Sequence, residues 1–173
     1  MQTQRPVLHE FFVATQARAF RQAEIAVGNR DDAMDIVQDA MIRLARNYSD
    51  REQDWNLLFH RILQNLIRDW FRRRKVRGIF VRQDNHEDDE NDIQDHITPT
   101  PEQNKQQEQL RQQISTALSH LPLRQQQAFL LRSWWGHDVA ETAYIMRCTK
   151  GSVKTHYSRA LEKLQIMLGE IAP

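Results

Sequence analysis

The chain has 173 residues, the size of one ordinary domain or of two small helical ones, and its scarce Gly and Pro, five of each, favour an all-α fold. Its single cysteine excludes an internal disulfide and a zinc site built from several cysteines, and we expect a protein of the reducing cytoplasm. The net charge is +1, no apolar run approaches the ~20 residues of a membrane span, and the first residues lack the apolar core of a signal peptide, so we expect no membrane insertion.

Three helices are predicted in the first half of the chain. Apolar residues recur at helical spacing over residues 8–27, and the Gly-Asn pair at 28–29 is typical of a helix end. A second helix, 31–48, begins with two aspartates, which the positive end of the helix dipole favours. A third helix, 55–77, contains four adjacent cations at 72–75. Together these helices predict a small bundle over residues 1–82.

An acidic segment separates two basic parts of the chain. Residues 1–82 hold fifteen Lys and Arg against ten Asp and Glu, residues 83–107 hold one against eight, and residues 108–173 hold eight against five. Residues 83–106 also carry two prolines and few apolar side chains, a composition that cannot offset the entropy of ordering. We therefore predict an extended linker at 83–106, which acts either as a solubilising spacer or as a contact of its own.

The last third of the chain predicts four helices and ends in a helix-turn-helix. Helices are expected at 107–118 and 124–134, and two more lie within 139–164, separated by a short turn that ends at the candidate N-cap Thr149. Turning Val153, Tyr157, Ala160 and Leu161 inward makes the opposite face of the last helix polar and cationic. Such a face suits base edges and phosphates in a major groove, although an ordinary helical hairpin with a solvated face has the same pattern.

The segment 65–77 interleaves aromatic residues with cations. Its Arg and Lys side chains are suited to a phosphate backbone, and Trp70 and Phe71 offer stacking faces for single-stranded or opened DNA. Both aromatics also continue the apolar stripe of their helix, which favours a place in the core. Four adjacent cations repel one another without an anionic partner, so we predict a polyanion as a ligand.

The order of these segments resembles the extracytoplasmic-function group of bacterial sigma factors. The resemblance rests on DAMDIVQDAMIRLARNY (32–48), WNLLFHRILQNLIRDWFRRRK (55–75), the acidic linker, LSHLPLRQQQAFLLRSWWG (118–136) and GSVKTHYSRALEKL (151–164). It implies two small helical domains: a sigma region 2-like domain at 1–82 and a region 4-like domain at 107–173. It also implies a protein that binds core RNA polymerase and promoter DNA, opens the minus-ten element with the first domain and reads the minus-thirty-five element with the second.

The resemblance assigns roles to three groups of residues. The polymerase-binding signature is matched by Asp35, Gln38, Asp39, Met41 and Arg43. The segment that recognises and opens the minus-ten element is matched by Arg61, Asn65, Asp69, Arg72 and Arg73. Contacts to the minus-thirty-five duplex are expected from Arg132, Ser152, Lys154, Thr155, Ser158 and Arg159, with Lys150 beside them on the outward helix face.

Two places depart from the family pattern. Leu58 stands where a Trp is usual, and the turn Trp134-Trp135-Gly136-His137-Asp138 replaces a common acidic-Gly-Leu-Ser sequence. The resemblance also implies an anti-sigma factor as a partner, although no residue identifies one.

No catalytic constellation is visible, so we expect no enzyme activity, no cofactor and no metal. The seven histidines lack ligand spacing on one helix, and we interpret them as surface or polar-network residues. A stand-alone helix-turn-helix regulator remains an alternative, but it leaves the polar face at 35–39 unexplained. A metal-dependent hydrolase or nuclease using the acidic run 84–95 would need carboxylates on rigid elements, and these lie in the predicted linker.

Overall fold

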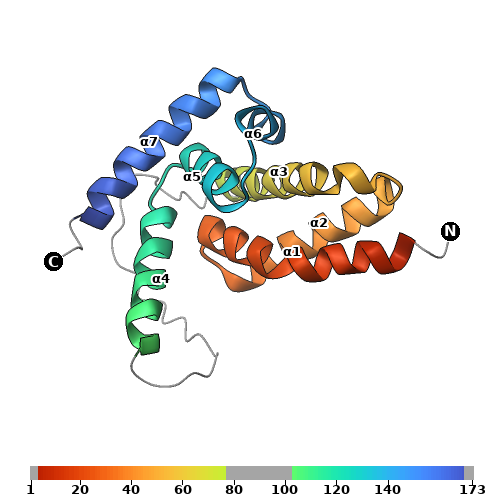
Figure 1. Ribbon diagram of the computed structural model, residues 1–173, viewed down its shortest axis with the longest axis horizontal. Coiled ribbons are helices and arrows are strands. Elements are labelled where there is room, and N and C mark those ends of the chain that lie inside the picture. The colour runs from red at the N-terminus through yellow and green to blue at the C-terminus, as the bar shows by residue number, and fades with distance from the viewer. Residues whose placement is uncertain (1–3, 77–102, 170–173) are drawn as a thin grey trace.

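The computed structural model describes residues 4–76 and 103–169, and this part of the chain is helical without a strand (Figure 1). The predicted all-α fold of two small domains is therefore confirmed. In the first domain, the helices are α1 (Gln4–Val27), α2 (Arg30–Tyr48), the short η1 (Glu52–Asp54) and α3 (Trp55–Val76). In the second, they are α4 (Gln103–Ser119), α5 (Leu123–Phe129), η2 (Leu130–Trp134), α6 (Val139–Met146) and α7 (Lys150–Gly169).

The first domain is a three-helix bundle whose core lies between α1, α2 and α3. Small residues such as Ala19, Ala33 and Ala40 are fully buried and let the helices approach closely, while Phe59 and Leu63 of α3 fill the space between them. Gly28 ends α1 with φ +67°, a left-handed conformation that costs glycine little. Asn29 then caps α2, because its side chain accepts a hydrogen bond from the Asp32 amide at 2.9 Å.

The second domain packs α4, α5, α6 and α7 around two apolar clusters. Leu131, Ile145 and Val153 are fully buried in one cluster, and Ala160 lies in the other with Leu130. Beyond α5 the chain widens into a π-helical turn, η2, so the single helix predicted at 124–134 has two parts. The helix-turn-helix between α6 and α7 turns at Arg147, which adopts φ +53° and caps α6.

The structure corrects some of the predicted packing and boundaries. Leu161, expected inside, is 41% exposed, while Val153, Ala160 and Leu164 on the same helix are buried. The helix α4 begins at Gln103, so its first turn overlaps the end of the predicted linker at 83–106. The rest of that linker lies outside the described residues. No helix within the described ranges is both long enough and apolar enough to cross a membrane.

The two domains touch along α1 and α3. In Figure 1, α6 lies beside α3, and α4 comes close to the end of α1. Ile25 of α1 is buried in a cluster of the second domain together with Leu118 and Leu130. Leu57 of α3 packs against the other cluster, around Leu131 and Ile145.

Candidate functional site

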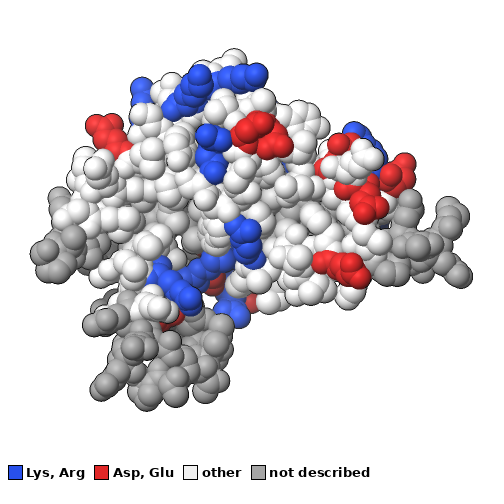
Figure 2. Space-filling model, in the orientation of Figure 1, with Lys and Arg blue, Asp and Glu red and all other residues white. Residues whose placement is uncertain are grey.

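The exposed face of α7 carries the polar and cationic side chains that the sequence predicted. The face opposite is fixed by buried Val153, Ala160 and Leu164. Figure 2 shows Lys and Arg side chains gathered over the end of α7 that lies next to α6. Five of the predicted residues are exposed and Ser152 is half-buried; the exposed ones are Lys150, Lys154, Thr155, Ser158 and Arg159.

Local hydrogen bonds fix where α7 begins and how α6 precedes it. Thr149 is the predicted N-cap: its Oγ1 accepts from the Ser152 amide at 3.1 Å. The helix α6 begins with a capping box, in which Asp138 accepts from the Glu141 amide at 2.8 Å and Glu141 accepts from the Asp138 amide at 2.9 Å. Our sequence reasoning missed this box, although the Asp-x-x-Glu spacing signals it.

Arg132 is half-buried within the second domain. Its Nη1 donates to the carbonyl oxygen of His137 at 2.7 Å, and its guanidinium lies 5.7 Å from the ring of Tyr157. The guanidinium of Arg132, which is assigned to the minus-thirty-five duplex, is therefore held by a hydrogen bond within the domain. The assignment itself stays a prediction.

The residues assigned to the minus-ten element lie along α3, but their surroundings differ. Arg61 stacks over the Tyr144 ring of α6 at 4.3 Å, so it lies where the two domains meet. Asn65 accepts a hydrogen bond from Arg68. Asp69 pairs with Arg72 at 3.5 Å, and its carbonyl oxygen accepts from Arg73 at 3.3 Å. The Arg72 side chain is 83% exposed, which leaves its charge available to a ligand.

Trp70 and Phe71 are half-buried and pack against the core of the first domain. Their rings meet edge to face with centroids 4.9 Å apart, and Arg74 lies over the Trp70 ring at 4.9 Å. These contacts favour the interpretation of both aromatics as core residues over that of a free stacking platform.

The α2 face assigned to polymerase binding is largely exposed. Asp35 and Gln38 are exposed, and Asp39 pairs with Arg43 at 3.0 Å on the surface. Met41 is half-buried against the core, so it supports the helix from beneath. A groove of about 520 Å³ runs between this face and α3, lined by Asp35 and Asp39 on one side and by Trp70, Arg73 and Arg74 on the other.

Two of the seven histidines form a buried pair between the domains. The Nδ1 of His60 lies 2.8 Å from the Nε2 of His137, and both side chains are withdrawn from water. Burial, and then the nearness of His137, lowers the pKa of His60 to about 3. Burial also lowers the pKa of His137, although Glu141 and Asp138 act in the opposite direction. Among the described residues, no group of His, Cys, Asp and Glu is placed to hold a metal ion.

Two family matches cover the two domains. The Sigma-70 region 2 family matches residues 11–77, and the Sigma-70 region 4 family matches residues 111–164. A stand-alone helix-turn-helix regulator accounts for the second match but not for the first.

Curated relatives agree with these matches. The chain is 31% identical over 144 residues to the ECF RNA polymerase sigma factor EcfG of Rhodopseudomonas palustris, covering 82% of this chain and 74% of that protein. It is 26% identical over 170 residues to SigM of Mycobacterium tuberculosis, covering 95% of this chain and 79% of that protein. It is 28% identical over 149 residues to SigX of Bacillus subtilis, covering 80% of this chain and 72% of that protein.

A solved structure shares the fold. It is the sigma factor RpoE of Bartonella quintana in complex with the anti-sigma factor NepR, with a TM-score of 0.66 and 22% identity over 93% of this chain and 96% of that one. This shared fold agrees with the two family matches and with the sequence relatives, which identify the family. The chain belongs to the extracytoplasmic-function group of the sigma-70 family, as a sigma factor that directs promoter-specific transcription initiation.

Proposed function

We propose that the two domains divide promoter recognition between them. Residues 1–82 bind core RNA polymerase through α2 and open the minus-ten element with α3, while residues 107–173 read the minus-thirty-five duplex with α7. The observation that carries this proposal is the two-sided character of α7. One side is fixed in the core by Val153, Ala160 and Leu164, and the other presents hydroxyls and cations to solvent.

The exposed side of α7 has the chemistry of a recognition helix. A major groove is wide enough to admit an α-helix, where hydroxyl and ammonium groups meet base edges. Lys154, Thr155 and Ser158 lie along the exposed face and are suited to this readout. Lys150 and Arg159 flank these residues along the chain and are suited to the phosphate backbones on either side of the groove.

The α3 helix is suited to opened strands through its charge. Arg72 and Arg73 are exposed at its C-terminal part, where a polyanion neutralises their mutual repulsion. Asn65 is half-buried about two turns before them, and its amide can read a base edge once its bond to Arg68 is exchanged. Because Trp70 and Phe71 belong to the core, we assign strand binding to these polar groups and not to aromatic stacking.

The α2 face is suited to a basic protein surface. Asp35, Gln38 and Asp39 project from one helix, and the Asp39–Arg43 pair is exposed, so its replacement by an intermolecular ion pair costs little. Core RNA polymerase supplies this surface in our proposal. Neither domain needs to perform covalent chemistry in this role, and we propose that the protein acts in the cytoplasm without enzyme activity.

An anti-sigma factor is the proposed regulatory partner. The solved structural relative was captured in complex with an anti-sigma factor, and the present chain matches it over 93% of its length. The acidic linker at 83–106 has a separate proposed role: its negative charge suits a basic channel of the polymerase that otherwise holds nucleic acid.

The readout by α7 is tested by exchanging its exposed side chains in the full chain. Thr155→Ala and Ser158→Ala, each assayed with core polymerase, are expected to change the preferred minus-thirty-five sequence, because a lost base contact costs ~1–3 kcal/mol. Gln165→Ala, at an exposed position further along the same helix, serves as the control. Unchanged sequence preference in both variants would refute the assignment of α7 to base readout.

A further inference from the structure

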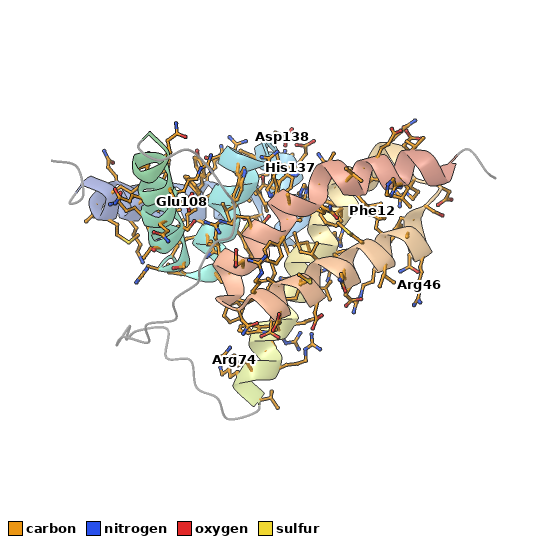
Figure 3. The ribbon with its side chains drawn as sticks, turned by 90° about the horizontal axis from the view of Figure 1, so that it is seen from below. Phe12, Arg46, Arg74, Glu108, His137 and Asp138 are labelled. Atoms are coloured by element: carbon orange, nitrogen blue, oxygen red, sulfur yellow. The ribbon has the colours of Figure 1, made fainter. Side chains whose placement is uncertain are left out.

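The turn Trp134–Asp138 joins η2 to α6 and lies between the two domains. The indole nitrogen of Trp135 donates to Oε1 of Gln22 on α1 at 2.6 Å, and the Trp135 ring lies 4.2 Å from the ring of His60 on α3. Arg18 of α1 lies over the same indole at 4.4 Å and donates to the carbonyl oxygen of Trp134. A single turn therefore contacts two helices of the other domain, and Figure 3 shows His137 and Asp138 at this junction.

The geometry of the turn is fixed from within the second domain. The Trp135 and His137 amides both donate at 2.9 Å, to the carbonyl oxygens of Leu130 and Leu131 in η2. Gly136 between them has φ +76°, a conformation that side chains rarely adopt, and it reverses the chain so that Trp135 and His137 reach the same partner, His60. The π-helical turn and Gly136 thus place the rings of Trp135 and His137 in contact with the first domain.

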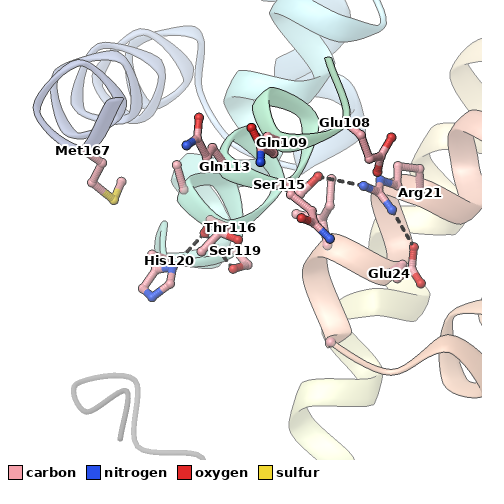
Figure 4. Close-up of a pocket in the computed structure, with 14 residues that line it drawn as sticks. Arg21, Glu24, Glu108, Gln109, Gln113, Ser115, Thr116, Ser119, His120 and Met167 are labelled. Carbon is pink, nitrogen blue, oxygen red and sulfur yellow. Dashed lines mark hydrogen bonds and ion pairs between the residues drawn. The ribbon is translucent and has the colours of Figure 1, made fainter. Parts of the chain in front are cut away.

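Three buried polar side chains of this contact each have a partner across the domains, although Nε2 of His60 has none among the described residues. Gln22 is 1% exposed, His137 is 2% exposed and His60 is fully buried, and each finds a hydrogen-bond partner in the other domain. A further bond joins Arg21 of α1 to Ser115 of α4 at 3.0 Å (Figure 4). Buried polar groups are costly unless they are paired, so this pattern indicates a specific contact and not a chance apolar one.

The closed arrangement is incompatible with simultaneous reading of both promoter elements. Elements centred near positions −35 and −10 lie about 25 base pairs apart, roughly 85 Å along a straight duplex. A compact chain of this length has a radius of gyration of ~16 Å, and hence a diameter of roughly 40 Å. Domains in contact therefore cannot occupy both elements. The 26 residues at 77–102, drawn out fully, cover at most ~90 Å, so the covalent link permits the necessary separation.

The contact also engages two residues assigned to DNA. Arg61, assigned to the minus-ten element, is stacked on Tyr144 of the other domain. Arg132, assigned to the minus-thirty-five duplex, donates to the carbonyl oxygen of His137 in the turn. Opening the domains frees Arg61 and releases the turn to which Arg132 is bonded.

We propose that the Trp134–Asp138 turn is an interdomain latch, which keeps the free protein closed and must open before both promoter elements are engaged. This inference rests on the proposed division of promoter recognition between the two domains.

The test measures the distance between the domains in the full chain. Dyes for energy transfer are attached to cysteines introduced at exposed Arg30 of the first domain and Arg111 of the second, which line the same groove between the domains, in a background carrying Cys148→Ser. The latch variant is Arg18→Ala with Gln22→Ala, and Trp135→Ala opens the latch from the other side. Gln16→Ala with Arg46→Ala is the matched control, because it removes the same residue types from exposed positions of the first domain. Circular dichroism checks the helicity of each variant.

We expect high transfer efficiency in the wild type and in the control, and lower efficiency in both latch variants. Loss of these interdomain bonds is expected to lower the ratio of closed to open protein on the order of tenfold. The amount of protein that gives half-maximal run-off transcription is expected to fall by up to the same factor, because the closed state no longer competes. Adding core polymerase and promoter is expected to lower the transfer efficiency of the wild type.

Equal transfer efficiency in the wild type and in both latch variants overturns the latch. High efficiency of the wild type in the complete promoter complex overturns it as well. These results are distinct from a failure of the proposed function, which appears as absent transcription in the wild type whatever the distance between its domains.

Discussion

Acidification is expected to open the closed form, because the interface holds a histidine pair that cannot accept protons without cost. The pKa of His60 is about 3 in the closed protein, where burial disfavours the charged ring. Its other nitrogen, Nε2, is buried without a hydrogen-bond partner among the described residues, so a proton added there is an unpaired charge. In the open protein the ring meets water and regains an ordinary pKa of ~6.5.

The difference between the pKa of His60 in the closed and in the open protein sets the direction and the size of the pH effect on closure. A depressed pKa in the closed state means that the stability of closure is fully present above pH ~6.5 and is lost as the pH falls toward 3. Between pH 7.5 and 5.5, protonation of the open form by His60 alone lowers the closed-to-open ratio about tenfold, or ~1.4 kcal/mol. The lowered pKa of His137 adds in the same direction.

The charged groups around the pair have opposing effects. Arg18 of α1 faces His60 and lowers its pKa further, which strengthens the response to acid. Glu141 of α6 lies 3.4 Å from Nδ1 of His137, and it raises the pKa of that ring together with Asp138. The two acidic groups therefore weaken the contribution of His137, and His60 carries most of the effect.

Energy transfer between dyes at positions 30 and 111, measured at pH 7.5 and 5.5, reports the closed-to-open ratio. Efficiency is expected to fall on acidification in the wild type and to change much less in His60→Gln, which keeps a hydrogen-bonding side chain but does not titrate. The reasoning is refuted if the wild type shows no change, or if His60→Gln responds to acid as strongly as the wild type.

Three further predictions concern the proposed interfaces. Replacing Gln38 with Ala and Asp39 with Arg is expected to weaken polymerase pull-down while changing the stability by less than ~0.5 kcal/mol, as usual for exposed sites; undiminished capture would contradict it. Replacing Asn65 or Arg72 with Ala is expected to impair strand opening, measured by permanganate reactivity of unpaired thymines, and to leave duplex preference unchanged; wild-type reactivity would argue against the α3 assignment. A neutral Gly/Ser stretch in place of residues 84–95 is expected to lower transcript yield at physiological salt, and an equal yield would make the segment a spacer only.

Helix positions could be predicted from the sequence because they depend on local periodicity and caps. The apolar stripes of α2 and α3 and the cap at Thr149 are visible in the chain, and the structure bears them out. The turn between α6 and α7, at residues 147–149, contains no glycine, although glycine is common in such turns. Arg147 adopts the left-handed conformation there, and because this conformation is uncommon for arginine, the sequence could not predict it.

Contacts between the domains could not be predicted, because they join residues far apart in the sequence. His60 and His137 are separated by 77 positions, and no sequence pattern around either histidine predicts that the two rings pair. The helical period of α7 is also an incomplete guide: it places Leu161 inside, but the neighbouring elements cover only the stripe of Val153, Ala160 and Leu164. The unusual turn at 134–138 was visible as a departure from the family, and its position between the domains came only from the structure.

Run-off transcription with purified core RNA polymerase and promoter fragments tests the central claim most directly. The full chain, added to core polymerase, is expected to produce transcripts of defined length from a subset of promoter fragments, and core polymerase alone is expected to produce none from them. Binding of the chain to promoter DNA without polymerase, together with no polymerase-dependent transcript from any fragment, would contradict the account.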